Sequence, residues 1–218
     1  MSTNTVRHPI FARVFDRISP SIERDVGRHR GELLDGLSGR VVEIGAGNGA
    51  NFEHYPETVV EVVAIEPEAY LRRKATAAAR DAPVPVSVRD AVAEALPLVR
   101  HSVDVAVASL VLCSVGDPQR ALAELRRVLK PGGELRFVEH VRADDPRKAR
   151  LQRRLDGSGL WPRVAGGCHC ARDTVATIEA AGFDVERVRS FDLGPAWLHT
   201  NPHAIGTARA PRALASVP

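Results

Sequence analysis

A glycine-rich turn follows a short apolar stretch and has the spacing of a nucleotide-binding loop. Residues 41–44 predict a buried strand. Gly45 and Gly47 after it let the backbone turn sharply and approach a ligand with no Cβ in the way. We expect a helix to follow, capped by Asn48 or Asn51, with its free N–H groups facing that ligand.

The acid that precedes this turn separates two kinds of ligand. Gly45-x-Gly47-x-x-Ala50 fits the dinucleotide fingerprint, in which the last glycine can be alanine. Glu43, at the end of the strand, would repel the pyrophosphate of NAD but would attract an ammonium group. S-adenosylmethionine carries an ammonium group on its methionine half and has no phosphate. Glu43 therefore favours S-adenosylmethionine, and an NAD-binding oxidoreductase is the alternative enzyme.

Two further acids stand where predicted strands end. Glu66 follows the apolar run 59–65, about 20 residues beyond the turn, where it would accept hydrogen bonds from both hydroxyls of a ribose. Asp90 follows the valine-rich run 84–88. We expect Asp90 to accept from the exocyclic amine of adenine while an N–H near Ala91 serves a ring nitrogen, and a plain loop role is the alternative.

Composition limits the class of protein. The 218 residues favour one domain, and 44% hydrophobic with 26% charged residues is normal for a globular chain. The net charge of +3 comes from scattered arginines and only 5% of the residues are aromatic, so we expect no nucleic-acid partner. No apolar run has the length of a membrane span, and the first residues show no signal-peptide pattern. Three cysteines are too few, and odd in number, for a disulfide framework, so we expect a cytoplasmic protein. We expect it to be a monomer or a homodimer.

The order of the predicted elements indicates an α/β domain over residues 40–210. Strands alternate with helices, which gives parallel strands joined by crossovers and covered on both faces. Residues 1–39 predict two helices separated at Pro20, and we expect them to form a lid across the mouth of the site. Simple packing against the sheet is the alternative for these helices. Residues 211–218 predict a disordered tail.

Together with the segment Leu129-Lys130-Pro131-Gly132-Gly133, these features resemble the class I S-adenosylmethionine-dependent methyltransferases over roughly residues 10–209. The resemblance implies a Rossmann-like three-layer sandwich. Its seven-stranded, mostly parallel sheet would have an antiparallel last strand inserted between strands five and six. The cofactor would be S-adenosylmethionine. Its expected contacts are Glu43, Gly45, Ala46, Gly47, Asn51, Glu66, Pro67, Asp90, Ala91, Ser109 and Leu110.

A narrower resemblance concerns the methyltransferase-like subgroup whose animal members methylate small alkyl thiols. The segments that carry it are Gly49-Ala50-Asn51-Phe52, Ser109-Leu110-Val111-Leu112-Cys113-Ser114-Val115, Glu139-His140-Val141, Gly167-Cys168 with Arg172, and Asn201-Pro202-His203-Ala204-Ile205-Gly206. The sequence departs from the animal members because it lacks their hydrophobic N-terminal membrane anchor. We therefore expect no membrane attachment.

Groups that handle the acceptor should come from the carboxyl ends of the strands, because the ligand crevice of an open parallel sheet lies there. His140 and His203 are the candidate catalytic bases or positioning residues, with structural hydrogen bonds as the alternative. We expect no metal, since the ligands of Cys168-His169-Cys170 stand too close together and have no partner pair. The candidates for the acceptor side are His54, Tyr55, Cys113, Trp161 and Cys168.

The expected activity is methyl transfer from S-adenosylmethionine to a small molecule, with a thiol as the favoured acceptor. A thiol is partly ionised near neutral pH and needs no dedicated base. No Asn/Asp-Pro-Pro-Tyr segment follows the fourth predicted strand, which speaks against nitrogen atoms of bases and amides. The alternatives are O-, N- or C-methylation of a small metabolite or natural product, and a non-catalytic cofactor-binding module.

Overall fold

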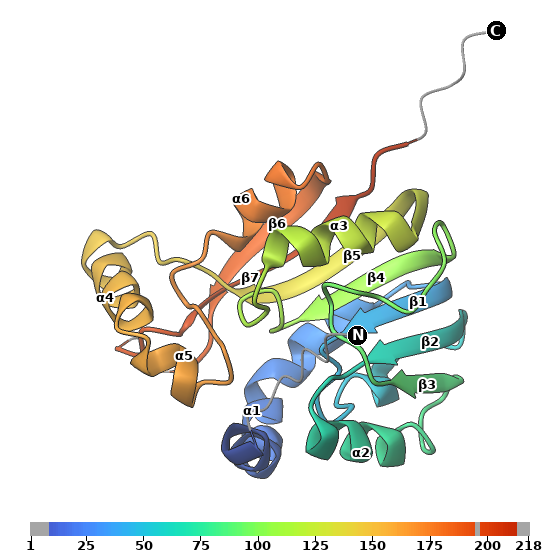
Figure 1. Ribbon diagram of the computed structural model, residues 1–218, viewed down its shortest axis with the longest axis horizontal. Coiled ribbons are helices and arrows are strands. Elements are labelled where there is room, and N and C mark those ends of the chain that lie inside the picture. Colours follow the sequence, from blue (N-terminus) through green and yellow to red (C-terminus); the bar gives the residue numbers. More distant parts are fainter. Residues whose placement is uncertain (1–8, 195–196, 213–218) are drawn as a thin grey trace, which may run out of the picture.

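The computed structural model describes residues 9–194 and 197–212, with the side chains of 18–26 excepted. Within these ranges seven strands form one sheet in the order β3-β2-β1-β4-β5-β7-β6 (Figure 1). The strands are β1 (Gly39–Ile44), β2 (Val59–Ile65), β3 (Val86–Arg89), β4 (Val103–Ser109), β5 (Leu129–His140), β6 (Asp184–Asp192) and β7 (Pro202–Arg209).

The direction of the strands matches the prediction. β7 runs antiparallel to both β5 and β6, and the remaining neighbours in the sheet are parallel. The seven-stranded sheet with an antiparallel last strand between the fifth and sixth is thereby confirmed. Parallel neighbours need long crossovers, whereas β6 and β7 are joined by a loop alone and therefore pair in opposite directions.

Helices cover both faces of this sheet. They are α1 (Pro9–Leu34), α2 (Ala69–Ala78), α3 (Pro118–Val128), α4 (Pro146–Gly157), α5 (Leu160–Val164) and α6 (Thr174–Ala180), with one 3₁₀ turn, η1 (Phe52–His54). Aspartates fix the start of three of them, since Asp117, Asp145 and Asp173 each accept a backbone N–H from the first turn of α3, α4 and α6. No helix in the described ranges is long and apolar enough to cross a membrane.

The sheet separates two hydrophobic cores. Successive strand residues point to opposite faces, so Val42 of β1 belongs to one core and Val41 to the other. Leu122 of α3 and Ile178 of α6 pack in the first core, and Leu34 of α1 packs in the second. Figure 1 shows α3 and α6 on one side of the sheet and α1 and α2 on the other, which confirms the three-layer sandwich.

The helix break predicted at Pro20 is wrong. The chain forms one helix from Pro9 to Leu34 (Figure 1), whose first part is seen end-on and whose last part is seen from the side. A proline inside a helix removes one hydrogen bond and bends the helix, but it need not end it. Leu33 and Leu34 anchor the second half in the core, and this burial supports the helix beyond the proline.

The helix predicted after the glycine turn is also wrong. Residues 50–58 contain only the 3₁₀ turn η1, and Pro56 follows it closely. Asn51 stands at the N-cap position but its side chain makes no capping hydrogen bond. Ligand contacts at this turn therefore come from the turn itself and from side chains, and not from the N-terminus of an α-helix.

The fifth strand contains residues that usually belong to turns. β5 starts at Leu129 and includes Gly133, with an irregular register opposite Val103 and Val105 of β4. A Cβ on Gly133 would lie 2.8 Å from the carbonyl oxygen of Lys130, so this tight passage requires glycine.

The two faces of β2 provide a matched test of the core. Val63 is fully buried and Val60 is 70% exposed on the same strand. We expect Val63→Ala to lower the free energy of unfolding by about 2 kcal/mol, because it removes two buried methyl groups and leaves a cavity. Val60→Ala is the control and should change it by less than about 0.5 kcal/mol. Denaturant unfolding measures both, and equal effects would contradict the described layering.

Candidate active site

A cavity lies where β1, β2 and β4 end, and residues of α1 form part of its wall. Phe11 and Phe15 of α1 line it with stacked rings. Most of the predicted cofactor residues line it as well. They are Glu43, Gly45, Ala46, Gly47, Asn51, Glu66, Pro67, Ser109 and Leu110.

Glu43 is held at the bottom of a buried hydrogen-bond network. Asn51 Nδ2 donates to Glu43 Oε1 at 2.7 Å, and the Tyr55 hydroxyl donates to Oε2 at 2.8 Å. Arg30 Nη1 donates in turn to Asn51 Oδ1 at 2.5 Å. Tyr55 was predicted on the acceptor side, but it is buried beneath Glu43 and does not line the cavity. Its role in the structure is to orient this carboxylate.

Burial raises the pKa of Glu43 to about 7, and the hydrogen bonds from Tyr55 and Asn51 and the charge of Arg30 oppose this only in part. A cationic group in the cavity would stabilise the ionised carboxylate. The site therefore fits the ammonium group of S-adenosylmethionine and not a pyrophosphate.

Glu66 holds the glycine turn from the end of the neighbouring strand. Its Oε2 accepts from the N–H of Gly47 and its Oε1 accepts from the N–H of Glu68, both at 2.8 Å. Burial raises the pKa of Glu66 to about 7, opposed by these two backbone donors. The carboxylate lines the cavity beside Gly47, so one group both orders the turn and faces the ligand space.

The turn itself brings backbone close to the ligand space. Gly45 has a φ of +64°, and a Cβ there would lie 2.4 Å from Cγ2 of Val111. Glycine is therefore required where the turn passes beneath the loop after β4. The two buried acids and the glycine turn between them fit S-adenosylmethionine.

Other predicted residues lie outside the cavity wall. Asp90 is exposed and pairs with Arg72 at 2.9 Å, and Ala91 packs against the core. The ion pair engages Oδ2 of Asp90, and the predicted contact with adenine stays a prediction. His54 lies beside Glu53 at the surface end of η1, at 3.7 Å, and does not line the cavity.

Glu139 was not predicted as a site residue, although it organises the loop after β4. It is fully buried, and its carboxylate accepts the N–H groups of Val111, Leu112 and Cys113 at 2.9, 2.8 and 3.1 Å. Burial raises the pKa of Glu139, and these three donors and His140 oppose the shift. The sequence placed Glu139 at the end of an apolar strand and in a segment of the narrower resemblance, and neither observation indicates three backbone partners.

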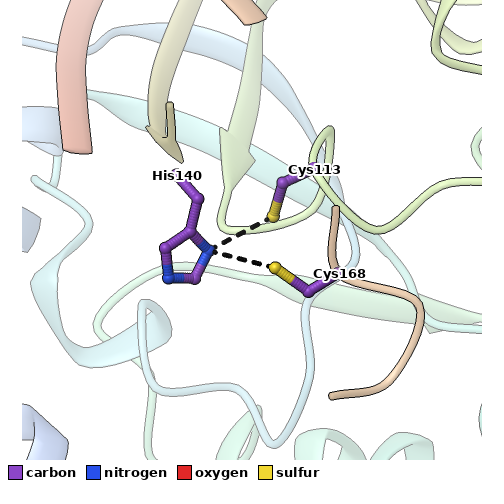
Figure 2. A group of neighbouring side chains, drawn as sticks. All are labelled: Cys113, His140 and Cys168. Carbon is purple, nitrogen blue, oxygen red and sulfur yellow. Dashed lines mark hydrogen bonds between the residues drawn. The ribbon is translucent and has the colours of Figure 1, made fainter. Parts of the chain in front are cut away.

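Three groups from distant parts of the sequence meet next to this loop. Cys113 Sγ and Cys168 Sγ each lie 3.5 Å from Nδ1 of His140 (Figure 2). The hydrogen bond from Cys113 and the hydrogen bond and charge of His140 lower the pKa of Cys168 to about 5, against the effect of burial. The same bond with Cys168, together with burial, raises the pKa of Cys113. Burial alone would lower the pKa of His140, but Cys168 and Glu139 raise it.

The second candidate base is not placed like the first. His203 is buried, its Nδ1 donates to the carbonyl oxygen of Asn201 at 2.7 Å, and its ring lies 4.4 Å from that of His140. Burial and the neighbouring His140 lower the pKa of His203 to about 3. His203 is therefore neutral, hydrogen-bonded to Asn201 and in ring contact with His140. Trp161 lies edge-on to His199 at 4.4 Å, beside Cys168, and does not line the cavity.

Comparison with known proteins now decides the family. A model described as "Methyltransferase domain" matches residues 42–137. The thiol S-methyltransferase TMT1B of Rattus norvegicus is 36% identical over 80% of this chain and 73% of its own length. The thiol S-methyltransferase TMT1A of Homo sapiens is 34% identical over 91% of this chain and 82% of its own length. The chain belongs to the family of S-adenosylmethionine-dependent methyltransferases that includes these two relatives.

Two solved structures share the fold of this chain. An S-adenosylmethionine-dependent methyltransferase from Mesorhizobium loti has a TM-score of 0.62 and 21% identity, covering 85% of this chain and 97% of its own. The (4+2) cyclase SpnF has a TM-score of 0.69 and 20% identity, covering 93% and 95%. At these identities the likeness concerns the fold alone. Because one of the two is a cyclase, the fold by itself does not fix the reaction.

The two buried acids predict how the stability of the cofactor-free methyltransferase depends on pH. Their folded pKa of about 7 lies above the ordinary 4.5, so the folded state binds more protons between these values. The stabilisation is complete below pH 4.5 and is lost as the pH rises through about 7. Each acid contributes on the order of 3 kcal/mol to this loss.

Glu43→Gln isolates one of the two contributions. We expect the variant to show a smaller fall in the free energy of unfolding between pH 5 and 8 than the wild type, by roughly the contribution of one acid. Glu57→Gln, at an exposed position, is the control and should follow the wild type. Denaturant titrations at several pH values measure the slopes. Parallel curves for wild type and Glu43→Gln would show that Glu43 has an ordinary pKa.

Proposed function

We propose that this methyltransferase transfers the methyl group of S-adenosylmethionine to the thiol of a small molecule. The observation that carries the proposal is the identity of 32–36% to thiol S-methyltransferases, over 80–91% of this chain. The cavity supports it, because Phe11, Phe15, Leu110 and Val111 give it an apolar wall suited to an alkyl or aryl thiol. Nitrogen, oxygen and carbon acceptors are the alternatives.

The cofactor half of the proposal assigns one role to each buried acid. Glu43 accepts the ammonium group of the methionine half, and Asn51 and Tyr55 keep its oxygens in place. Glu66 accepts the ribose hydroxyls while it retains the N–H of Gly47. The loop at Ser109 and Leu110 lines the same cavity, and Leu110 has a φ of 55° there. Such strained backbone persists only where surrounding contacts impose it.

The chemical step is an in-line displacement at the sulfonium methyl carbon. The acceptor sulfur forms the new S–C bond with its lone pair. The old C–S bond breaks and its electron pair returns to the sulfur of S-adenosylhomocysteine. The cofactor supplies an electrophile with a good leaving group, so the protein mainly aligns the acceptor and excludes water. A thiolate needs no base at the moment of transfer, which leaves His140 and His203 as positioning residues.

α1 has the position of a lid in this proposal. Phe11, Ala12 and Phe15 line the cavity from above the glycine turn. A Cβ on Gly166 would lie 2.4 Å from the ring of Phe11, so α1 also packs closely on the loop after α5. The methyltransferase domain would then be residues 40–210, with the helix as its cover. The predicted tail at 211–218 lies, from residue 213, outside the described residues. We further propose a cytoplasmic monomer or homodimer.

An acceptor panel tests the proposed function. The purified protein is incubated with S-adenosylmethionine and with thiols, phenols and amines of matched size, and S-adenosylhomocysteine is measured. We expect turnover with the thiols and at least roughly tenfold less with the matched phenols and amines, since only the thiols are appreciably ionised and nucleophilic near neutral pH. Turnover confined to phenols or amines would overturn the thiol assignment and leave the fold and cofactor unchanged. Cofactor binding without turnover would favour a non-catalytic module.

Glu66→Ala tests the cofactor assignment. The change removes charge-assisted hydrogen bonds to the ribose, so we expect affinity for S-adenosylhomocysteine to fall by about 1.5–3 kcal/mol, or roughly 10–100-fold. Isothermal titration calorimetry measures the loss, and Glu57→Ala at an exposed position is the matched control. Unchanged affinity with a folded variant would remove Glu66 from the cofactor site.

A further inference from the structure

Two thiols and one imidazole from three separate parts of the fold converge beside the loop after β4, and none of the three residues lines the cavity. Cys113 lies in the loop after β4, His140 ends β5, and Cys168 follows α5 (Figure 2). Both sulfurs lie 3.5 Å from Nδ1 of His140, and the three atoms lie within 4.8 Å of one another. The proposed methyl transfer does not require this arrangement, so it calls for an explanation of its own.

Two arrangements account for this cluster. A ring nitrogen offers either one proton or one lone pair, so Nδ1 of His140 can make one good hydrogen bond. Without an ion that bond joins His140 to Cys168, and Cys113 bonds to Cys168 instead. A cation between the three atoms would engage all of them at once.

The distances agree with a tetrahedral metal ion. Zinc binds sulfur at about 2.3 Å and nitrogen at about 2.0–2.1 Å, and at a tetrahedral angle these bonds place the two ligand atoms about 3.5–3.6 Å apart. Both S–N distances in the cluster are 3.5 Å. Soft thiolate ligands select zinc over magnesium or calcium, and two cysteines with one histidine form a known set for zinc with an exchangeable fourth ligand.

We propose that Cys113, His140 and Cys168 bind one zinc ion whose fourth position opens toward the cofactor cavity. From the sequence we expected no metal, because the ligands of the neighbouring set Cys168-His169-Cys170 stand too close together. Cys170 is not part of the cluster, because its sulfur and its N–H both contact Asp156 Oδ1, at 3.5 and 3.2 Å. The backbone of His169 donates to the carbonyl oxygen of Cys113 at 2.8 Å and so joins the two cysteine-bearing loops.

The surroundings hold the three ligands and leave one side toward the cavity. Glu139 accepts the N–H of Cys113, and Thr174 Oγ1 donates to the carbonyl oxygen of His140 at 3.1 Å. Ser114 lines the cavity, and its hydroxyl lies 3.5 Å from the sulfur of Cys113. Gly166, two residues before Cys168, lines the same cavity. An exchangeable ligand would therefore reach the ion past Ser114 and Gly166, the cavity-lining residues next to the cluster.

The fourth position fits the acceptor itself, an assignment that rests on the proposed function. A thiol binds the zinc as thiolate and releases its proton to solvent. Its sulfur lone pair then forms the S–C bond with the cofactor methyl, and the electron pair of the broken bond stays on S-adenosylhomocysteine. The product is a neutral thioether, a weaker zinc ligand than a thiolate, and it dissociates.

Metal content tests the site without any turnover. Protein purified under reducing conditions is loaded with zinc, passed over a desalting column and measured by mass spectrometry of the metal. We expect about one zinc per chain in the wild type, and at least roughly 100-fold weaker zinc binding in Cys113→Ser and Cys168→Ser, because even second-shell changes cost 10–100-fold. Cys170→Ser is the matched control, another buried cysteine outside the cluster, and should keep its zinc.

Several results would overturn the site. One is a wild type without stoichiometric zinc, and another is a zinc content that is unchanged in both cluster variants. A third is a disulfide between Cys113 and Cys168 that persists after purification under reducing conditions. Affinity for S-adenosylhomocysteine verifies that each variant is folded. If a serine variant does not fold, His140→Ala tests the same site in the same way.

Cobalt separates this inference from the proposed function. In protein loaded with Co²⁺, we expect a thiolate-to-cobalt charge-transfer band and the visible bands of a tetrahedral ion. Hexanethiol, added without S-adenosylmethionine, should shift these bands, whereas hexanol should not. Bands that ignore the thiol would overturn the open fourth position. Thiol methylation by protein without metal would overturn the binding of the acceptor to zinc and keep the proposed function. Bound zinc without thiol methylation would support the zinc site and overturn the proposed function.

Discussion

The carboxylate of Glu139 is the constraint on which the acceptor side of the structure depends. It sits fully buried at the end of β5 and accepts three consecutive N–H groups of the loop after β4. A buried carboxylate without such donors would be strongly disfavoured, and N–H groups without an acceptor would be disfavoured as well. Each therefore fixes the other. The consequence is that Cys113 is held next to His140, the residue that follows Glu139 in the chain.

A second loop is fixed on the first by backbone contacts. The N–H of His169 donates to the carbonyl oxygen of Cys113, and Arg172 Nη1 donates to the carbonyl oxygens of Leu112 and Val115 at 2.7 and 2.9 Å. A Cβ on Gly167 would lie 2.7 Å from the carbonyl oxygen of Ser114, so glycine allows this close approach. These contacts bring Cys168 to the same point as Cys113 and His140, far from it in sequence.

On the cofactor side, two buried acids that the ligand requires lower the stability of the ligand-free fold. Glu43 and Glu66 are both buried, and burial raises the pKa of each to about 7. Ionised acids in such a place weaken the fold unless a ligand compensates them. Asn51 and Tyr55 around Glu43, and the N–H groups of Gly47 and Glu68 around Glu66, keep the oxygens oriented in the meantime.

The sequence by itself determined the alternation of strands and helices and the acids at the strand ends. Strand periodicity and apolar runs depend on neighbours along the chain, and parallel strands bring their carboxyl ends to one edge, so Glu43 and Glu66 could be predicted to meet. Tertiary packing decided the rest. Burial of Leu33 and Leu34 supports α1 beyond Pro20. Asn51, expected to cap a helix, donates a hydrogen bond to Glu43 instead. The meeting of Cys113, His140 and Cys168 depends on the path of two loops, and that path is set by hydrogen bonds to Glu139 and between the loops, which no spacing along the chain encodes.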